Sequence, residues 1–308
     1  MRSGHLLIGL GAAAVLTATM GVATAQDLGV PTPGGLGYQE PATESMERLI
    51  SLSAALHWIA FLITLFVTVL LGWTCWRYSE KRNPVASRFS HNTTVEVAWT
   101  LIPVLILVGI AYPSIKYLYY QETVPPSDVT VKAIGASGWW WNYEYVIDGE
   151  EVAYSSFMAG GQHASYEQME AFMQGRRDGG ETVEETPSRA LWKLKTTAPM
   201  VVPVDSIIRV QVTSEPGGVL HAFAVPAFGV KADAVPGSLH ETWFEANKVG
   251  TFYGQCSELC GRGHSYMPIE VEVVSKEDFK KRLLEVQEIA NGPSESTTKL
   301  AAVVPVEE

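Results

Sequence analysis

The sequence predicts a two-helix transmembrane hairpin followed by an all-β sandwich or barrel domain. Three observations support this prediction: two long apolar blocks near the N-terminus, a change to period-two hydrophobicity after Tyr120, and a cluster of soft metal ligands near the C-terminus. Of the 308 residues 47% are hydrophobic and only 18% are charged, and the apolar excess is concentrated before Tyr120.

The first 25 residues have the pattern of a signal peptide. Arg2 supplies a positive charge, an apolar stretch runs from Leu6 to Val22, and Ala23-Thr24-Ala25 fits the small-x-small cleavage rule. The mature chain is therefore expected to begin at Gln26. The alternative is an uncleaved anchor helix, which is disfavoured because a polar stretch rich in Gly and Pro follows at once.

Two further apolar blocks predict membrane-spanning helices at about 52–77 and 96–119. Ala54–Trp76 has 23 residues with His57 as its only ionisable group apart from Cys75, and Val97–Ile115 has 19 residues and no charge. At ~1.5 Å per residue each block can cross a hydrocarbon core of ~30 Å. Cys75 lies inside the first block and is interpreted as a small packing residue.

The charges that flank the two blocks orient the hairpin. Residues 26–53 carry one basic residue and four acids, whereas the segment between the blocks carries four basic residues against Glu80 and, at the start of the second span, Glu96. Cytoplasmic loops are enriched in Lys and Arg, so the connecting segment is expected in the cytoplasm and both ends of the mature chain outside. The four basic residues are Arg77, Lys81, Arg82 and Arg88.

Residues 121–292 are expected to form the exported β domain. Short alternating or apolar runs separated by Gly and Pro are typical of a sandwich or barrel, and a helix is expected from Ser275 to about Ala290. The polar, Gly-rich segment 155–189 is interpreted as a surface insertion with at most a short helix, and 293–308 as a disordered tail. The expected strands lie at 129–134, 143–147, 208–213, 219–225, 251–254 and 269–273.

The exported part of the chain is acidic. Between Gln121 and Glu308 there are 15 Lys and Arg against 27 Asp and Glu, a net charge of −12. This charge disfavours nucleic acid as a partner, because nucleic-acid binding depends on neutralising phosphates. It leaves open a basic protein partner or an acidic surface that is simply solvated.

Four soft metal ligands, namely Cys256, Cys260, His264 and Met267, are close together in the sequence, and His221 lies on an expected strand upstream. Two thiolates, two imidazoles and a thioether suit copper, and one thiolate more than a mononuclear blue-copper site needs favours two bridged coppers. The residues alone leave two alternatives open. One is a Cys256–Cys260 disulfide, and the other is a zinc site, which would not use the thioether.

These residues resemble the copper motif of cytochrome c oxidase subunit II. The resemblance implies a cupredoxin-like Greek-key barrel and a location in a bacterial inner membrane, with the barrel in the periplasm. Only 155–189 and the two ends of the chain fall outside this resemblance. The resemblance rests on Cys256–Gly261 (CSELCG) with His264 and Met267, on Leu220–Gly237 (LHAFAVPAFGVKADAVPG), on Trp139–Tyr145 (WWWNYEY) and on His91–Thr100 (HNTTVEVAWT).

The resemblance also implies the ligands of a dinuclear copper centre. The two cysteines would bridge both copper ions, each histidine would bind one, and Met267 would be a weak axial ligand. The backbone carbonyl of Glu258 would complete the second copper, and its side chain would reach a magnesium ion shared with subunit I. The implied ligand set is His221, Cys256, Glu258, Cys260, His264 and Met267.

Two further roles follow from the resemblance. Trp139 takes the place of the exposed tryptophan through which electrons arrive, with Trp140 as the alternative, because the usual His-Gln before it is replaced by Ala136-Ser137-Gly138, one residue longer. Glu96, at the start of the second span, takes the place of a glutamate at the mouth of a proton path into subunit I. Its alternative is an acid at the membrane interface without a proton-transfer role.

The acids expected to dock a basic cytochrome c are Glu144, Glu215 and Asp148. The loop before His221 is longer than the family pattern and lacks its usual aspartate, so docking is expected to use this altered set. The implied function is to take electrons from cytochrome c and pass them to haem in subunit I, where oxygen is reduced and protons are pumped. Two alternatives are disfavoured: a quinol oxidase subunit, because every copper ligand is present, and a self-standing copper domain resembling that of nitrous oxide reductase, because of the two spans.

Overall fold

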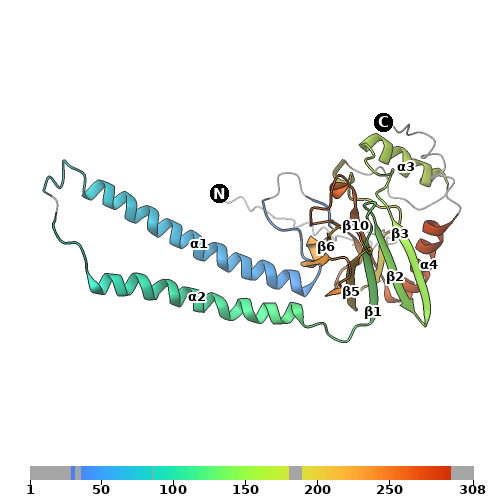
Figure 1. The fold of residues 1–308 in the computed structure, drawn as a ribbon, viewed down its shortest axis with the longest axis horizontal. Coiled ribbons are helices and arrows are strands. Elements are labelled where there is room, and N and C mark those ends of the chain that lie inside the picture. Colours follow the sequence, from blue (N-terminus) through green and yellow to red (C-terminus); the bar gives the residue numbers. More distant parts are fainter. Residues whose placement is uncertain (1–28, 32–35, 86, 180–188, 293–308) are drawn as a thin grey trace, which may run out of the picture.

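The computed structural model describes residues 29–31, 36–85, 87–179 and 189–292 as a long helical hairpin joined to a β domain (Figure 1). The expected signal peptide at 1–25 and the expected tail at 293–308 lie outside the described residues.

The hairpin consists of α1 (Glu44–Arg77) and α2 (Thr93–Glu122), which run side by side away from the β domain (Figure 1). Each begins at a polar cap: the Thr43 side chain accepts a hydrogen bond from the backbone of α1, and the Asn92 side chain does the same for α2. Both helices are long and apolar enough to cross a membrane, and no residue in the most apolar window of each is buried. The chain therefore has two candidate membrane spans.

Both helices extend beyond the spans expected at 52–77 and 96–119 because their outer ends pack on the β domain. Thr43 Oγ1 donates to the carbonyl of Phe228 at 2.8 Å, and Gln121 Nε2 donates to the carbonyl of Gly229 at 2.9 Å. Met46 is buried against Gly229: a Cβ at Gly229 would come within 3.1 Å of Met46 Cα, and the left-handed backbone (φ 69°) would strain a residue with a side chain there. The extra turns thus fix the direction in which the hairpin leaves the domain.

The β domain is built from a five-stranded sheet, a three-stranded sheet and a two-stranded ribbon. The five-stranded sheet has the order β3-β2-β1-β5-β8, the three-stranded sheet β4-β10-β9 and the ribbon β6-β7. β1 runs parallel to β5 and β4 runs parallel to β10, and the other pairs are antiparallel. The strands are β1 (Val129–Gly135), β2 (Trp141–Ile147), β3 (Glu150–Ser156), β4 (Met200–Pro203), β5 (Ile207–Ser214), β6 (His221–Val225), β7 (Val230–Ala234), β8 (His240–Glu245), β9 (Gly250–Gln255) and β10 (Pro268–Val274).

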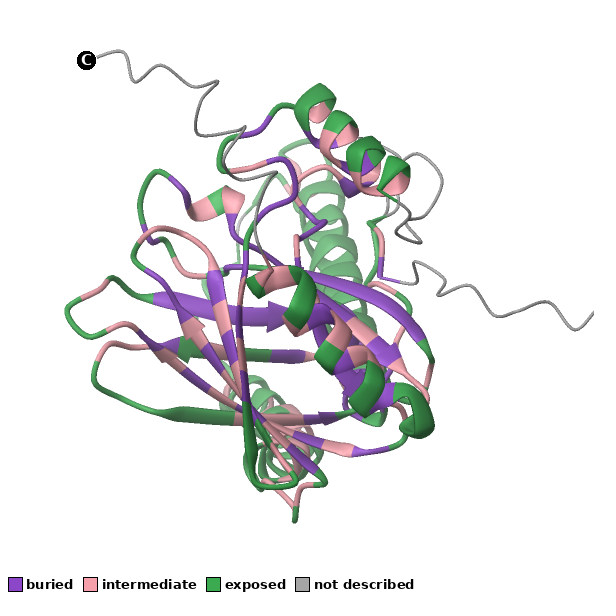
Figure 2. Ribbon diagram, turned by 90° about the vertical axis from the view of Figure 1, so that its right-hand side faces the viewer, coloured by how far each residue is buried: buried purple, intermediate pink, exposed green. Residues whose placement is uncertain are grey.

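One apolar core lies between these sheets. β1 alternates buried and half-buried residues as its period-two pattern predicts, whereas β6 is buried along its whole length. Figure 2 shows the buried residues gathered inside the sheets. The α4 helix (Lys276–Asn291) packs against β3 and β4 through Phe279, Leu283 and Val286, which recur at helical spacing, and it ends one residue past the expected Ala290.

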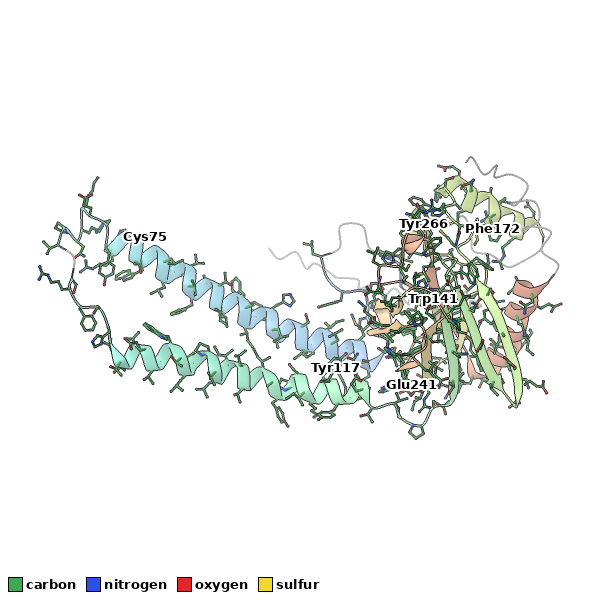
Figure 3. All side chains as sticks on the ribbon, viewed as in Figure 1. Cys75, Tyr117, Trp141, Phe172, Glu241 and Tyr266 are labelled. Atoms are coloured by element: carbon green, nitrogen blue, oxygen red, sulfur yellow. The ribbon has the colours of Figure 1, made fainter. Side chains whose placement is uncertain are left out.

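The segment expected as a surface insertion, 155–189, is more ordered in its described part than its sequence suggested. β3 ends inside it, and α3 (Tyr166–Asp178) follows, with a capping box between Ser165 and Gln168. Met169 and Met173 are buried in a small cluster of their own. Phe172 of α3 and Tyr266 lie at the same end of the β domain (Figure 3), which is the end that carries the candidate site. The remaining short elements are the 3-10 turns η1 (Arg189–Leu191), η2 (Pro226–Phe228) and η3 (His264–Tyr266).

Candidate metal centre

Strand pairing brings the soft ligands together. β9 and β10 pair antiparallel with Gln255 opposite Pro268, so Cys256 and Met267 stand at the two ends of one closed loop. His221 is the first residue of β6, and the backbone of Ser257 donates to the carbonyl of Ala222 at 3.1 Å, which ties that loop to β6. The ligand on the distant strand therefore faces the loop.

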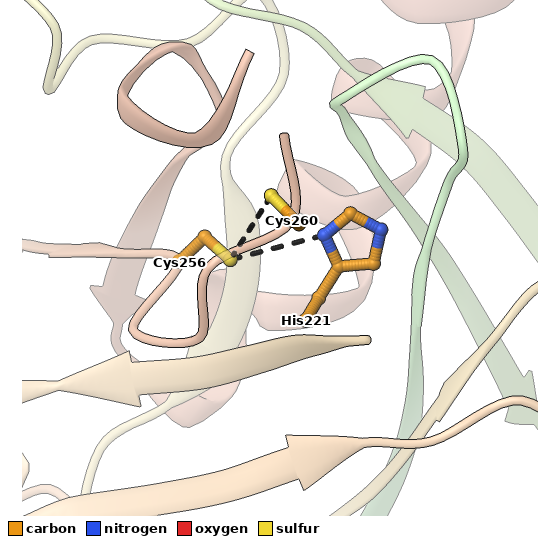
Figure 4. Close-up of side chains that lie close together, drawn as sticks. All are labelled: His221, Cys256 and Cys260. Atoms are coloured by element: carbon orange, nitrogen blue, oxygen red, sulfur yellow. Dashed lines mark hydrogen bonds between the residues drawn. The ribbon is translucent and has the colours of Figure 1, made fainter. Parts of the chain in front are cut away.

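The donor atoms converge on one buried point. The Sγ atoms of Cys256 and Cys260 are 3.8 Å apart, and His221 Nδ1 lies 3.8 Å from Cys256 Sγ (Figure 4). On the other side, Cys260 Sγ lies 3.6 Å from His264 Nδ1 and 3.7 Å from Met267 Sδ. The ligand atoms of His221, Cys256 and Cys260 all lie within 4.8 Å of one another.

Glu258 contributes its backbone to the same point. Its carbonyl oxygen lies 3.3 Å from Cys256 Sγ, and its residue is half-buried. All six ligands expected from the sequence are thus placed around a single site.

The chemistry of this donor set fits a soft metal. The two cysteines are free, and their 3.8 Å separation is far from the ~2.05 Å of a disulfide bond. His221 is buried, and its Nε2 has no hydrogen-bond partner among the described residues, while Nδ1 faces the thiols. Buried thiols, imidazoles and a thioether are ligands that copper accepts and that hard cations do not, so this His/Cys/Cys group is consistent with a copper site.

Burial favours the uncharged forms of Cys260 and His221 in the absence of a metal. It raises the pKa of the Cys260 thiol to about 12, and the neighbouring Cys256 thiol adds to the rise. It also lowers the pKa of His221, against an opposing contribution from Glu215. A bound cation would reverse the penalty on the thiolates, so metal binding at this site should release protons.

Trp139 packs on the ligand loop. Its indole N–H donates to the carbonyl of Cys260 at 3.0 Å, and its ring lies against Gly261 and Gly263. A Cβ at Gly263 would stand 2.2 Å from Trp139 Cγ, so this contact requires glycine.

The other two tryptophans of the run face elsewhere. Trp141 is fully buried, with its indole N–H 3.4 Å from the carbonyl of Met267. The ring of Trp140 turns to Phe157, with the ring centroids 5.2 Å apart. Of the two candidates from the sequence, Trp139 is the one that touches the ligand loop.

Two contacts around the site were not anticipated. A Cβ at Gly135 would lie 2.6 Å from His221 Cδ2, so the glycine that ends β1 makes room for that ring. The segment 155–189 reaches the site as well: the His163 ring meets the Tyr266 ring edge-on, with centroids 4.4 Å apart. A glycine at the end of a predicted strand was a usable signal for the first contact, whereas nothing in the sequence pointed to the second.

The other residues that were predicted to have a function either lie far from the metal ligands or form ion pairs. Glu96 is in the first turn of α2, at the far end of a helix that rises about 45 Å. Glu144 pairs with Lys132 at 2.8 Å, and Asp148, at the opposite end of β2 from Trp141, pairs with Lys280 at 2.6 Å.

Glu215 is nearest to the site among the predicted docking acids. Its Oε2 accepts from the backbone N–H of Ser137 at 2.9 Å, next to the Trp139 turn.

Comparison with known proteins gives the same picture over the whole chain. The family model of the periplasmic domain of cytochrome c oxidase subunit II matches residues 129–274, and that of its transmembrane domain matches 31–117. The chain is 42% identical over 315 aligned residues to cytochrome c oxidase subunit 2 of Cereibacter sphaeroides, covering 99% of this chain and 97% of that protein.

Two solved structures are also similar. The periplasmic domain of subunit II of cytochrome oxidase from Bradyrhizobium japonicum is 40% identical, with a TM-score of 0.41 over 55% of this chain and 99% of that one. A mixed disulfide between a thioredoxin-like protein and subunit II of cytochrome c oxidase contains a chain 39% identical, with a TM-score of 0.39 over 55% of this chain and 96% of that one.

The fold and the site define a membrane protein with two candidate spans and a periplasmic, cupredoxin-like domain that carries a His/Cys/Cys group consistent with a copper site. The chain belongs to the cytochrome c oxidase subunit II family, and it is therefore a subunit of a terminal oxidase.

Proposed function

We propose that this chain is the subunit through which electrons reach the oxidase, by way of a dinuclear copper centre. The observation that carries the proposal is the 3.8 Å approach of two free, buried thiols with one imidazole nitrogen facing each of them. Cys256 and Cys260 would bridge the two copper ions. The terminal ligands would be His221, His264, Met267 and the carbonyl of Glu258. When bound, such a pair shares one electron between two metals and so accepts and releases it with little change in geometry.

The protein's own part is to hold this pair in place and to bring electrons to it. Trp139 is half-buried and hydrogen-bonded to the carbonyl of Cys260, so it offers a bonded route from the surface to a bridging ligand. We place electron arrival from cytochrome c at this indole, and delivery to haem in subunit I on the side of the loop that carries Glu258. The Glu258 side chain is assigned to a magnesium ion shared with subunit I.

The membrane part of the proposal concerns orientation and protons. The basic residues between the spans support an orientation in which that segment would lie in the cytoplasm of a bacterial cell and the β domain in the periplasm. Glu96 then lies near the cytoplasmic face, where its Oε1 accepts from the backbone N–H of Asn92 at 3.1 Å. We assign to it the mouth of a proton path into subunit I.

Metal loading is proposed to need both thiols reduced. The structurally similar chain that was captured in a mixed disulfide with a thioredoxin-like protein suggests a partner that could keep this pair reduced in an oxidising compartment. Cys256 is buried, so such a partner would act before the metals are bound.

The proposal is tested by Cys256→Ser in the complete oxidase. The variant should lose the visible and near-infrared absorption of the dinuclear centre and should no longer accept electrons from cytochrome c, while the haem spectrum of subunit I is retained. The matched control is Cys75→Ser, since Cys75 is exposed on α1 and far from the site. An unchanged copper spectrum in Cys256→Ser would contradict the proposal.

A further inference from the structure

Three segments that depart from the family pattern meet at one point of the structure, next to Trp139. They are the lengthened turn Ala136–Gly138, the lengthened loop before His221, and the described part of the segment 155–189. They are separate in the sequence, yet the turn makes direct hydrogen bonds to each of the other two segments.

The turn that carries Trp139 is strained. Ala136 N donates to the carbonyl of Trp140 at 3.0 Å, and Trp139 N donates back to the carbonyl of Ala136 at 3.0 Å. This closure leaves Trp139 in the left-handed region, with φ 65°, which a residue with a Cβ adopts only when its surroundings enforce it. Groups outside the turn are therefore needed to hold it.

Glu215 holds the turn from the side of the His221 loop. Its Oε2 accepts from Ser137 N at 2.9 Å, and its own backbone N–H donates to the carbonyl of Gly135 at 3.1 Å. Ser214 Oγ lies at the same place, 3.1 Å from Gly135 O and 2.7 Å from Val219 O, so its one proton can be donated to either carbonyl.

Gln162 holds the turn from the other side. Its amide nitrogen donates to the carbonyl of Gly138 and lies 3.4 Å from the carbonyl of Trp139. Both neighbours are acceptors, which determines that the amide presents nitrogen rather than oxygen.

The loop that carries Gln162 is itself fastened to the barrel. Ala159 N donates to the carbonyl of Lys195 at 3.0 Å, and the indole of Trp192 donates to the carbonyl of Ala164 at 3.0 Å. The segment to which this loop is attached is held in turn by Glu270, a buried acid of β10. Glu270 accepts from Thr196 N at 2.7 Å and from Lys195 Nζ at 3.2 Å. The loop that carries Gln162 is therefore held in place by hydrogen bonds to the barrel.

We propose that Gln162 and Glu215 are positioning residues that together hold the Trp139 turn in the conformation from which its indole reaches Cys260. The inference rests on the proposed role of Trp139 in electron arrival. It gives the described part of segment 155–189 a function: supplying one half of this clamp. The clamp acts on the rate of electron transfer within the bound complex, and copper binding does not depend on it. The charge of Glu215 serves docking as well, so affinity for the electron donor is independent of the clamp only on the side of Gln162.

The test uses the complete oxidase and a basic cytochrome c carrying a photoactivatable ruthenium label, which separates the first-order electron transfer in the complex from association. Gln162→Ala, the near-isosteric Gln162→Glu and Glu215→Ala should each lower the first-order rate by about fivefold, the factor expected for one lost hydrogen bond. Glu215→Gln should restore it, because its amide oxygen still accepts from Ser137 although the charge is gone. Gln174→Ala on α3 is the matched control and should behave as the wild type.

Two further measurements separate positioning from a general folding role. The copper absorption should stay at the wild-type value in all these variants, and the affinity for the cytochrome should stay at the wild-type value in both Gln162 variants. A wild-type first-order rate in both Gln162 variants, with Trp139→Phe slow, would overturn the clamp and leave the proposed function standing. Loss of the copper spectrum in Gln162→Ala would also overturn it. A wild-type rate in Trp139→Phe would overturn the proposed electron route together with the clamp.

Discussion

The indole N–H of Trp139 donates to the backbone carbonyl of Cys260 at 3.0 Å. This hydrogen bond joins the half-buried indole ring to Cys260, whose Sγ is one of the donor atoms of the candidate metal site. It also explains why the ligand loop carries glycine at Gly261 and Gly263, since the ring lies directly on the backbone there. The predictions below start from this contact and proceed outward.

Gly263→Ala should displace Trp139. The added Cβ would lie 2.2 Å from Cγ and 2.6 Å from Cβ of the tryptophan, atoms too close to the backbone to swing aside. We expect a changed tryptophan fluorescence and slower reduction of the copper centre by cytochrome c, with two coppers still bound. Gly37→Ala is the control, because nothing lies near its Cβ position. Unchanged fluorescence and rate in Gly263→Ala would contradict the contact.

Met267→Leu should keep both coppers and change their reduction potential. The Met267 sulfur is buried 3.7 Å from Cys260 Sγ, a position suited to a weak axial ligand that tunes a copper site without holding it. Leucine has a similar volume and no lone pair, so the potential should rise while the copper content is unchanged. Redox titration and metal analysis of the same sample check this prediction. Loss of one copper would show instead that Met267 is needed to bind the metal.

Glu96→Gln should slow oxygen turnover several-fold while copper content and cytochrome affinity stay unchanged, because the proposed role of Glu96 is proton delivery. The matched control is Glu47→Gln, an acid in the first turn of α1 at the opposite end of the hairpin. Turnover and proton pumping in reconstituted vesicles give the readout. Equal turnover in the two variants would favour the interpretation of Glu96 as an interfacial acid only.

Docking of a basic cytochrome c should be weakened by salt, since exposed charges are screened beyond ~8 Å at physiological ionic strength. Glu144→Gln combined with Glu215→Gln should lower the association rate more than the maximal turnover. The effect of Glu144 alone should be small, because Lys132 already pairs with it at 2.8 Å. Salt-insensitive electron transfer would point instead to a tethered or fused donor, for which steering by charge matters little.

Sequence patterns predicted the hairpin, the period-two strands and the cluster of soft ligands because each rests on local chemistry. Apolar length determines a span, and Cys256, Cys260 and Met267 lie on one short loop whose flanking strands pair. The complete ligand set and the preference for Trp139 over Trp140 came instead from the resemblance. The contact of Trp139 with the ligand loop depends on a left-handed residue in a lengthened turn, which local patterns do not predict. The contacts of Gln162 were not predictable either, because its partners lie on another loop.

The docking acids illustrate the same limit. Acid positions are visible in a sequence, but their partners are not: Asp148 proves to pair with Lys280 of α4, and Glu215 binds a backbone amide. A count of negative charges therefore does not show which carboxylates are already paired.

The most direct test of the account is the copper content and electron paramagnetic resonance spectrum of the purified periplasmic domain, from about Gln121 to Gly292, loaded with copper under reducing conditions and then partly oxidised. The account predicts two coppers per chain and a spectrum in which one unpaired electron is shared equally between two copper nuclei. One copper per chain with a single-nucleus spectrum, or a Cys256–Cys260 disulfide that persists in the assembled oxidase, would contradict it.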